Sequence, residues 1–476
     1  MPPLTLWLLI SAVLAQRQEI SLNSIIISNI TYNNISPPTF TLPTSDSPIN
    51  LSVSLCSDQL PSPRFFLNSA STSVPSPDGG DGGIEISLDE GLGTWNGTTP
   101  NGGILAVYTG QLSSGVVVPP WTFQLGVSNG DPLHTVLDGL PLLGDTTASQ
   151  ALIFSPSFSS LPISSPSYPN YTLPESNTTM PNAPSNVPNF TLALFPTSSS
   201  PPSLAKSACA VLGQQSANEN MTTSLAFRGS EGFRTQWLVE DLDNRTNYTA
   251  FVVQDGAKVS EAIFLSTKSS SFACPLLHSL PFCPQTAYSV PLQPPKAPFT
   301  SYNTTNLDPA ISSSFLSSLQ NFSTTLSAFP CGRDVYSPLK GCTDCFDTYR
   351  TWLCAVAFPQ CADPPSNPST FFSPTPPSES PTPALLAQSS SNRSPILPDL
   401  GTSHTILLPC IETCQAVDRS CPPFLGWRCP VMAVNANWSY GLGFIDGIDG
   451  SEGQGRISGA SGRGVDRWGG MWCSGL

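Results

Sequence analysis

The stretch Cys342-Thr-Asp-Cys345-Phe-Asp-Thr-Tyr-Arg-Thr-Trp-Leu-Cys354 decides the fold class of the C-terminal region. Its cysteines accompany apolar side chains at helical spacing, with Thr343 as the expected N-cap of a helix running to about Ala357. Cys345 and Cys354 are nine residues apart, so they lie on opposite sides of that helix and should pair with different partners. The sequence therefore predicts a helix held on both sides by disulfide bonds.

Ten of the 14 cysteines of this 476-residue chain fall at or after residue 331. Another helix is expected from Cys410 to Val417, with Cys410 and Cys414 on one face. Cys342-Thr-Asp-Cys345 also has the spacing of a zinc knuckle, but an oxidising compartment favours disulfides, so no metal or cofactor is expected. Ten cysteines allow five bridges, whose connectivity the sequence leaves open. The predicted disulfide cysteines are Cys331, Cys342, Cys345, Cys354, Cys361, Cys410, Cys414, Cys421, Cys429 and Cys473.

The extreme N-terminus reads as a secretory signal. Leu4 to Leu14 is an apolar run, and Val13-Leu14-Ala15 offers a cleavage site before Gln16, with an uncleaved anchor as the alternative. No comparable apolar stretch follows. We therefore expect the chain in the secretory pathway and at the extracellular face of the plasma membrane, with the endoplasmic reticulum as a second location. A partner or an uncleaved signal would hold it at the membrane.

Asparagine sequons agree with this compartment, because they are more frequent than the composition alone predicts. Glycans keep such positions at the surface. The sequon at Asn392 precedes a proline and is a poorer acceptor. The predicted glycosylation sites are Asn29, Asn34, Asn50, Asn96, Asn170, Asn177, Asn189, Asn220, Asn244, Asn247, Asn303, Asn321 and Asn437.

The N-terminal half reads as strand-rich. Ile84-Glu-Ile-Ser-Leu88 alternates apolar and polar side chains, as a half-buried strand does. Gly-Gly, Asn-Gly and Ser-Pro pairs separate further short strands, which favours β-sandwich-like packing. Cys56 stands alone and is expected to pair with Cys209 or with a more distant cysteine. Tyr248 is interpreted either as a tyrosine corner, whose hydroxyl bonds back to nearby backbone, or as an ordinary strand aromatic.

A helical period begins in the last third of the chain. Asp308 can cap a helix with Pro309 in its first turn, and apolar residues from Ile311 to Leu326 then form one stripe. We expect this helix to pack on the cysteine-rich domain rather than on a membrane, because its polar face has no Lys or Arg. Residues 362–400 are rich in Pro and Ser and are expected to be a disordered or extended insertion.

These observations predict an α+β multidomain protein, with a β-sandwich-like N-terminal half and a disulfide-rich helical C-terminal module. The net charge of −14 argues against a nucleic-acid partner. The predicted segments are a signal peptide at 1–15, an entry segment at 16–80, a β-rich domain with a Pro/Ser loop at 81–203, a second β-rich unit at 204–300, and a helical cysteine-rich domain at 301–476 with the insertion at 362–400.

Two resemblances follow from the cysteine block. Its eight-six and three-six spacings resemble those of the frizzled-type cysteine-rich domain. More closely, several motifs resemble the fungal Mid-type family (mating-induced death) of stretch-activated calcium-channel accessory subunits. In this family an aromatic and an acidic residue often precede the Pro-Cys at 409–410, where this chain has His404-Thr-Ile-Leu-Leu408. The motifs are Tyr349-Arg-Thr-Trp-Leu-Cys354, Phe358-Pro-Gln-Cys361, Pro409-Cys-Ile-Glu-Thr-Cys414, Arg419-Ser-Cys-Pro422, Asp466-Arg-Trp-Gly and Trp472-Cys473.

The resemblance implies a regulatory or accessory subunit of a plasma-membrane calcium channel. Such subunits assemble with a pore-forming subunit of the voltage-gated type and support calcium influx under stretch, mating pheromone or endoplasmic reticulum stress. The cysteines that match the motifs would be structural and needed for activity. A frizzled-like module also permits an alternative, in which a secreted or wall-associated glycoprotein or receptor binds a lipid or peptide.

Other readings have less support in the residues. The histidines, His134, His278 and His404, adjoin no nucleophile motif, so we expect no enzyme activity. Asp446-Gly-Ile-Asp449 with Asp466 lacks the spaced oxygen ligands of a calcium loop and reads as a solvated turn. With a single short apolar run the chain is not expected to line a pore, so it would modulate conduction rather than conduct.

Overall fold

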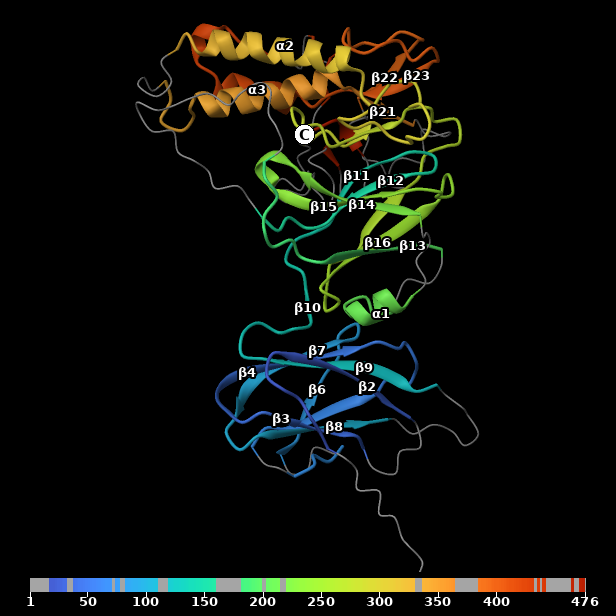
Figure 1. Ribbon diagram of the computed structural model, residues 1–476, viewed down its shortest axis with the longest axis vertical. Helices are drawn as coiled ribbons and strands as arrows, with labels where there is room; N and C mark the ends of the chain where they lie inside the picture. Colours follow the sequence, from blue (N-terminus) through green and yellow to red (C-terminus); the bar gives the residue numbers. More distant parts are fainter. Residues whose placement is uncertain are drawn as a thin grey trace, which may run out of the picture. The chain divides into compact units, whose positions relative to one another are not determined.

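A computed structural model shows the chain as two units (Figure 1). Unit 1 comprises Met1–Asp138, Ser199–Gln215 and Phe251–Ala262; unit 2 comprises Gly139–Ser198, Ser216–Ala250 and Ile263–Leu476. The sequence predicts contiguous domains divided at residues 81, 204 and 301, whereas these units interleave. The structure describes residues 17–31, 37–70, 73–77, 82–109, 119–159, 181–198, 203–214, 220–329, 336–363, 384–431, 435–436, 439–441, 464–465 and 471–475.

Unit 1 contains two sheets. One has the order β1-β3-β8-β5-β6 and the other β2-β9-β4-β7. The strands of the first are β1 (Gln18–Glu19), β3 (Thr39–Leu42), β8 (Gly103–Tyr108), β5 (Arg64–Asn68) and β6 (Ile84–Ile86). The strands of the second are β2 (Ser24–Ile30), β9 (Trp121–Ser128), β4 (Ser45–Leu55) and β7 (Leu92–Thr99).

One apolar core joins the two sheets. Phe123 of β9 is fully buried, and its ring meets Phe40 of β3 at 5.9 Å and Phe65 of β5 at 5.3 Å between centroids, edge to face in both cases. Such aromatic pairs add to the free energy of burying their area. The strand-rich N-terminal half predicted from alternating residues such as Ile84 and Ile86 is confirmed.

Shorter elements complete unit 1. Helix α1 (Ala208–Gly213) begins after its N-cap Ser207 and is bonded to the segment after β4 by the Cys56–Cys209 disulfide. Of the two pairings left open for Cys56, the one with Cys209 is therefore confirmed. Strand β10 (Thr135–Val136) pairs in parallel with β17 (Lys258–Val259).

In unit 2, a four-stranded antiparallel sheet has the order β11-β12-β15-β14. The residues before β16 form a tyrosine corner, because the Tyr248 hydroxyl accepts a 3.0 Å hydrogen bond from the Asp243 N–H. Tyr248 pairs with Leu265 across β16 and β18. The bounds are β11 (Leu142–Thr146), β12 (Ala151–Phe154), β13 (Phe190–Pro196), β14 (Met221–Phe227), η2 (Gly229–Glu231), β15 (Phe233–Val239), β16 (Asn247–Gln254) and β18 (Ile263–Ser266). The residues of β16 from Phe251 onward are assigned to unit 1.

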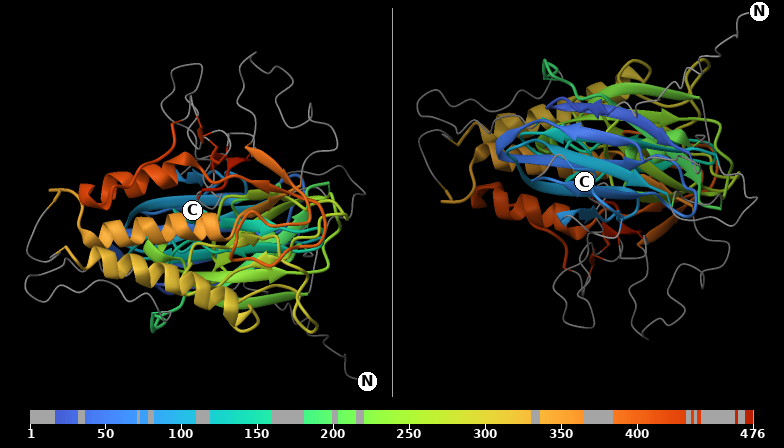
Figure 2. Two further views of the ribbon diagram at one scale, coloured as in Figure 1. Left: turned by 90° about the horizontal axis from the view of Figure 1, so that it is seen from above. Right: turned by 90° about the horizontal axis from the view of Figure 1, so that it is seen from below.

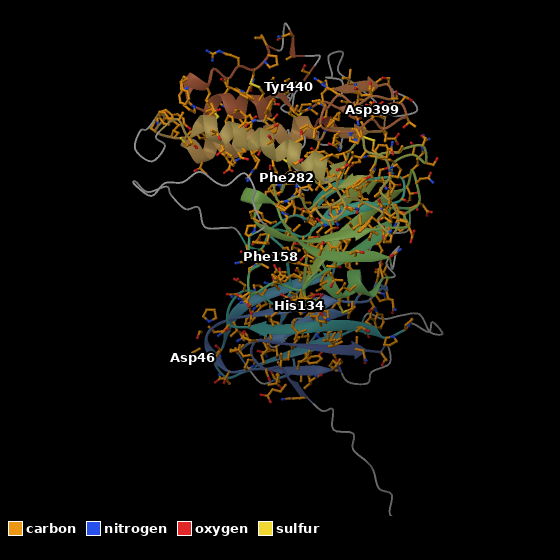
Figure 3. The ribbon with its side chains drawn as sticks, turned by 45° about the horizontal axis from the view of Figure 1, so that its top comes forward. Asp46, His134, Phe158, Phe282, Asp399 and Tyr440 are labelled. Atoms are coloured by element: carbon orange, nitrogen blue, oxygen red, sulfur yellow. A yellow bond between two sulfur atoms is a disulfide. The ribbon has the colours of Figure 1, made fainter. Side chains whose placement is uncertain are left out.

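Three helices lie side by side in unit 2, with α3 between α2 and α4 (Figure 2). Helix α2 (Pro309–Leu326) has the predicted N-cap, since Asp308 Oδ1 accepts the Ala310 N–H at 2.8 Å. Its apolar stripe is buried at Ile311, Phe315, Leu319 and Leu326, as the periodicity predicts. Phe282 lies beneath α2 in Figure 3, and its ring is 5.0 Å from that of Phe315.

The other two helices differ from prediction at their ends. Helix α3 (Cys342–Ala357) is capped by Gly341 rather than Thr343, because Asp344 reaches back to accept the Gly341 N–H at 2.8 Å. Helix α4 (Ile411–Ser420) extends beyond the predicted Val417, and Cys410 is its N-cap. Cys421 follows the end of α4, as the two prolines after it predict.

The insertion predicted at 362–400 needs correction. Residues 364–383 lie outside the described residues, but β22 (Leu385–Gln388) pairs with β23 (His404–Leu407), which also pairs with β21 (Gln360–Ala362). Leu397 and Leu400 are buried, so these apolar side chains hold residues 384–400 to the domain. The remaining elements are β19 (Leu276–Leu277), β20 (Tyr288–Ser289), η4 (Pro423–Leu425), β24 (Gly464–Val465) and β25 (Met471–Cys473).

Candidate functional site

Helices α2, α3 and α4, with the segments disulfide-bonded to them, form what we call the cysteine module. Helix α3 is held on two sides. Cys345 in its first turn is bonded to Cys421, just after α4, and Cys354 in its last turn is bonded to Cys283. The nine-residue spacing predicts different partners for these two cysteines, and this is confirmed.

Helix α4 is fixed at its N-terminus by covalent and backbone bonds. Cys410 is bonded to Cys473 of β25, and Cys414, one turn into the helix, is bonded to Cys429. The Cys410 N–H donates to Ser474 O at 2.9 Å, and the Ser474 N–H donates to Leu408 O at 2.8 Å. Cys410 and Cys414 thus share a helix face but staple different segments.

The ten C-terminal cysteines do not form a closed set of five bridges. Cys354 and Cys361 reach back to Cys283 and Cys274, which precede α2. Cys342 is also disulfide-bonded, and Cys331 lies outside the described residues. Cys274 and Cys283 were not among the predicted partners, because ten cysteines can pair among themselves and nothing in their spacing requires outside partners.

A row of aromatic rings lies across the cysteine module. We call Phe322, Tyr349, Trp352 and Trp427 the aromatic row; all four are half-buried. Phe322 of α2 stacks on Tyr349 of α3 with centroids 3.6 Å apart and planes 8° apart. Trp427 meets Trp352 edge to face at 4.7 Å. Burial raises the pKa of the Tyr349 hydroxyl, which therefore stays neutral at physiological pH.

Hydrogen bonds fix the two indoles of the aromatic row. Trp352 Nε1 donates to the Tyr440 hydroxyl at 2.9 Å, and Trp427 Nε1 donates to Cys414 O at 3.3 Å. Because Cys414 is itself bonded to Cys429, the position of Trp427 depends on that disulfide. The row is a set of large, partly exposed aromatic rings, a composition that is common in protein contact sites.

A buried carboxylate ties this module to the strands of unit 2. Asp145 of β11 accepts from Lys268 Nζ at 3.0 Å, from Ser289 N and Oγ at 2.9 and 2.6 Å, and from Gln360 Nε2 at 3.3 Å. Asp145 and Lys268 are both largely withdrawn from solvent. A buried ion pair of this kind fixes geometry, because either charge alone would be costly to bury.

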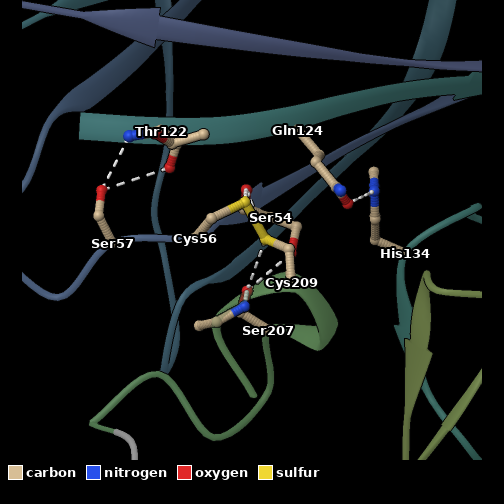
Figure 4. Close-up of a disulfide and its surroundings, with 9 residues drawn as sticks. Ser54, Cys56, Ser57, Thr122, Gln124, His134, Ser207 and Cys209 are labelled. Carbon is tan, nitrogen blue, oxygen red and sulfur yellow. Dashed lines mark hydrogen bonds between the residues drawn. A yellow bond between two sulfur atoms is a disulfide. The ribbon is translucent and has the colours of Figure 1, made fainter. Parts of the chain in front are cut away.

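The histidines have structural surroundings. His134 in unit 1 lies between Ser52 Oγ, 2.9 Å from Nδ1, and Gln124 Oε1, 3.1 Å from Nε2, near the Cys56–Cys209 disulfide (Figure 4). His278 in unit 2 lies between Gln236 Nε2, which is 3.1 Å from its Nδ1, and Ser301 Oγ, which is 3.1 Å from its Nε2. Burial lowers the pKa of both to about 4, so both imidazoles are neutral at physiological pH. His404 Nδ1 lies 3.1 Å from Thr402 O.

One group of side chains has the proximity that metal ligands need. Ligand atoms of Cys410, Glu412 and Cys473 lie within 4.8 Å of one another. Both sulfurs belong to one disulfide, so the group offers a single carboxylate and does not fit a metal ion. The acidic residues considered for calcium, Asp446, Asp449 and Asp466, lie outside the described residues.

The predicted glycosylation sites differ in exposure. Asn50 and Asn303 are half-buried, and Asn50 Nδ2 donates to Gly130 O at 2.5 Å. Asn34, Asn170, Asn177 and Asn437 lie outside the described residues. Glycan attachment stays a prediction at all of them. The exposed sites are Asn29, Asn96, Asn189, Asn220, Asn244, Asn247 and Asn321.

These features define a class of protein: strand-rich, with a disulfide-stapled helical region of the kind that forms in oxidising compartments. The chain belongs to the Mid1 family, described as a stretch-activated Ca²⁺-permeable channel component, whose family model matches residues 39–451. The resemblance to the fungal Mid-type family is confirmed. Among the described residues, no helix has both the length and the apolar content needed to cross a membrane.

Curated relatives carry channel names. The chain is 38% identical over 430 residues to the stretch-activated cation channel MID1 of Cryptococcus neoformans var. grubii, covering 82% of this chain and 66% of the relative. It is 30% identical to the stretch-activated cation channel yam8 of Schizosaccharomyces pombe, covering 47% and 44%, and 28% identical to MID1 of Saccharomyces cerevisiae, covering 41% and 35%. The chain therefore spans less than two thirds of the length of each of these relatives.

Solved structures add little. A periplasmic inhibitor of g-type lysozyme from Aeromonas hydrophila covers 23% of this chain and 95% of its own, with 16% identity and a TM-score of 0.17. Two fibronectin type III domains of chicken tenascin cover 52% of this chain with a TM-score of 0.13. Such scores carry no argument about fold or function.

Proposed function

We propose that this protein is a regulatory subunit of a plasma-membrane calcium channel and supports calcium influx triggered by stretch or mating pheromone. The observation that carries the proposal is the match of residues 39–451 to a family of stretch-activated channel components. Its partner is a pore-forming subunit of the voltage-gated type. The protein acts at the extracellular face of the plasma membrane, with the endoplasmic reticulum as a second location, and no catalytic step or cofactor is assigned to it.

The finer architecture serves this role. We take the two sheets of unit 1 as a β-sandwich and the cysteine module as a frizzled-like arrangement that presents the aromatic row to the pore subunit. Rings held by neighbouring helices and disulfides lose little freedom on binding, which favours affinity. Phe322, Tyr349 and Trp352 come from two helices that pack together, and the contacts between their rings hold them in place.

The chain modulates conduction rather than conducting. In support, α2 directs its apolar residues into the module's own core, where Phe315 and Leu319 are fully buried. The purified protein alone should give no cation current in planar bilayers. Reproducible calcium-permeable currents without a partner would overturn this part of the proposal.

The role in influx is tested in cells. Deleting the gene should reduce calcium uptake after hypotonic or pheromone stress, and the wild-type chain should restore it. Cys414→Ser should lose surface expression together with uptake, because Cys414–Cys429 holds both α4 and Trp427. Normal uptake in the deletion strain would remove the channel role. Normal surface expression of Cys414→Ser with lost uptake would instead assign that disulfide a direct part in the contact.

A second candidate is a secreted or wall-associated receptor that binds a lipid or a peptide. The half-buried aromatic row favours it, since exposed ring faces suit apolar ligands as well as proteins. Fractionation separates the two candidates: a channel subunit follows the plasma membrane, and a wall-associated protein follows wall glycan.

A further inference from the structure

Strand β2 is an edge strand of unit 1. It pairs with β9 over seven residues, from Ser24 opposite Val127 to Ile30 opposite Trp121 (Figure 1). Within the described ranges, no strand pairs with β2 on its other side. Alternate N–H and C=O groups of such an edge face outward and can pair with another strand.

The side chains of β2 are apolar or uncharged and do not oppose such pairing. Ile25 is 38% exposed and Ile27 is 66% exposed, on the face opposite Ile26, which packs on the core. The strand Ser-Ile-Ile-Ile-Ser-Asn-Ile contains no charged residue, no proline and no glycine. Natural edge strands are usually protected by a charge, a proline, a bulge or a covering segment. The sequence of β2 has neither a charge nor a proline, and its register with β9 is regular.

The opposite edge of the same sheet differs. The exposed side chains of β7 are polar, namely Thr94, Asn96 and Thr98, and the strand contains Gly93 and Gly97. The β7 edge therefore lacks the exposed isoleucines of β2. Both edges carry an exposed predicted sequon, Asn29 on β2 and Asn96 on β7, but only on β2 do exposed isoleucines share the face of the sequon.

Asn29 lies where an attached glycan would obstruct the β2 edge. It is exposed, stands in β2 itself, and alternation puts it on the same face as Ile25 and Ile27. Asn29, Ile30 and Thr31 form the acceptor motif. We propose that an N-linked glycan on Asn29 blocks the β2 edge and so keeps this strand from pairing with β2 of a second copy of the chain.

The second copy is the occupant that the strand favours, because β2 is self-complementary. Antiparallel pairing about a two-fold axis at Ile27 sets Ile27 against Ile27, Ile26 against Ser28 and Ile25 against Asn29. No like charges oppose each other in this register, and the exposed isoleucines of both copies would shield one another. A glycan on Asn29 would stand over Ile25 of the other copy and prevent the pairing by its bulk.

The test uses the full chain secreted from a glycosylating host, with glycopeptide mapping and light scattering after gel filtration. Wild type should be glycosylated at Asn29 and should not associate through this edge. Asn29→Gln should double the molar mass or form larger species. Asn96→Gln, the matched control, loses a glycan from the polar edge strand of the same sheet and should keep the wild-type molar mass.

A rescue variant separates edge pairing from misfolding. Ile27→Lys added to Asn29→Gln should restore the wild-type molar mass, because two lysines would then face each other at the two-fold axis. An unmodified Asn29 in the wild type overturns the proposal. So does an Asn29→Gln protein that keeps the wild-type molar mass, or association that Ile27→Lys leaves unchanged.

Discussion

Unit 1 and the cysteine module of unit 2 are built on different balances of forces. In unit 1, side chains from two sheets meet in one apolar core around Phe123, and the Cys56–Cys209 disulfide joins only α1 to the sheet. In the cysteine module, short helices share a core that is crossed by disulfides, with Cys345, Cys354 and Cys414 each bonded to a different segment.

The difference shows what each region can tolerate. A core of long-range strand pairs survives the loss of a peripheral staple, because its apolar area stays buried. Helices of ten to 18 residues are marginal by themselves and need their neighbours held in place. Unit 1 should therefore be sensitive to core truncation, and the cysteine module should be sensitive to reduction.

The largest effect is expected in the core of unit 1. Phe123→Ala removes a fully buried ring that contacts Phe40 and Phe65, and should cost about 4 kcal/mol of unfolding free energy. Denaturant unfolding of the purified chain measures it. Phe264→Ala is the control, since Phe264 is mostly exposed and its loss should cost far less. Equal costs for the two variants would contradict the assignment of Phe123 to the core.

Removing one staple from the cysteine module should rank next. The double variant Cys345→Ser/Cys421→Ser frees α3 from α4 and should cost about 3 kcal/mol. Hydrogen exchange should then rise across α3 and α4. The corresponding Cys56→Ser/Cys209→Ser variant should raise exchange in α1 and leave Phe65 and Phe123 protected. Global loss of protection in unit 1 would show that its core does not stand without the disulfide.

The pH dependence of stability tests both units, because each contains a buried histidine, His134 in unit 1 and His278 in unit 2. Burial lowers the pKa of His134 and of His278 to about 4. Between pH 6.5 and pH 4, each of these imidazoles is therefore protonated in the unfolded chain but neutral in the folded chain. Stability therefore falls as pH falls from 6.5 towards 4, by about 2 kcal/mol per histidine between pH 6.5 and pH 5.

Replacing one histidine isolates its contribution to this acid dependence. His134→Gln should flatten the acid dependence of unit 1 and leave that of unit 2 unchanged. Thermal unfolding from pH 7 to pH 5 provides the measurement. An unchanged slope in the variant would mean that His134 takes up its proton in the folded state.

The smallest effect concerns the start of α2. Asp308→Ala removes the acceptor of the Ala310 N–H and should cost about 1 kcal/mol. Asp308→Asn retains an acceptor and should cost a few tenths. Chemical denaturation followed by tryptophan fluorescence measures this cost, because Trp352 and Trp427 lie in the cysteine module. If Asp308→Ala lowered the free energy of unfolding as much as Cys345→Ser/Cys421→Ser does, the cap of α2 would contribute more to the module than one hydrogen bond explains.

Local chemistry made several parts of this structure predictable. The cap at Asp308, the stripe of α2 and the opposed bonds of Cys345 and Cys354 follow from helix geometry alone. The motifs around Cys354 and Cys414 were specific enough to identify the family. These features depend on residues close together in the sequence, where the physics of one helix turn decides the outcome.

The features that were not predicted depend on contacts between residues far apart in the sequence. Cys274 bonds to Cys361 of β21 across 87 residues, and Cys283 bonds to Cys354 of α3 across 71 residues. No spacing rule selects these partners over nearer cysteines. Strand β22 is extended by its partner β23 rather than by its own apolar content. The interleaving of the two units likewise reflects long-range strand pairing, which composition and local period do not encode.

The most direct measurement of the central claim is affinity purification of the tagged full chain from plasma membranes, followed by identification of co-purifying proteins. A multi-spanning pore protein should be recovered with the wild-type chain and should be lost with the Cys414→Ser variant. Recovery of wall glycan alone, with no channel protein bound to correctly folded wild type, would contradict it.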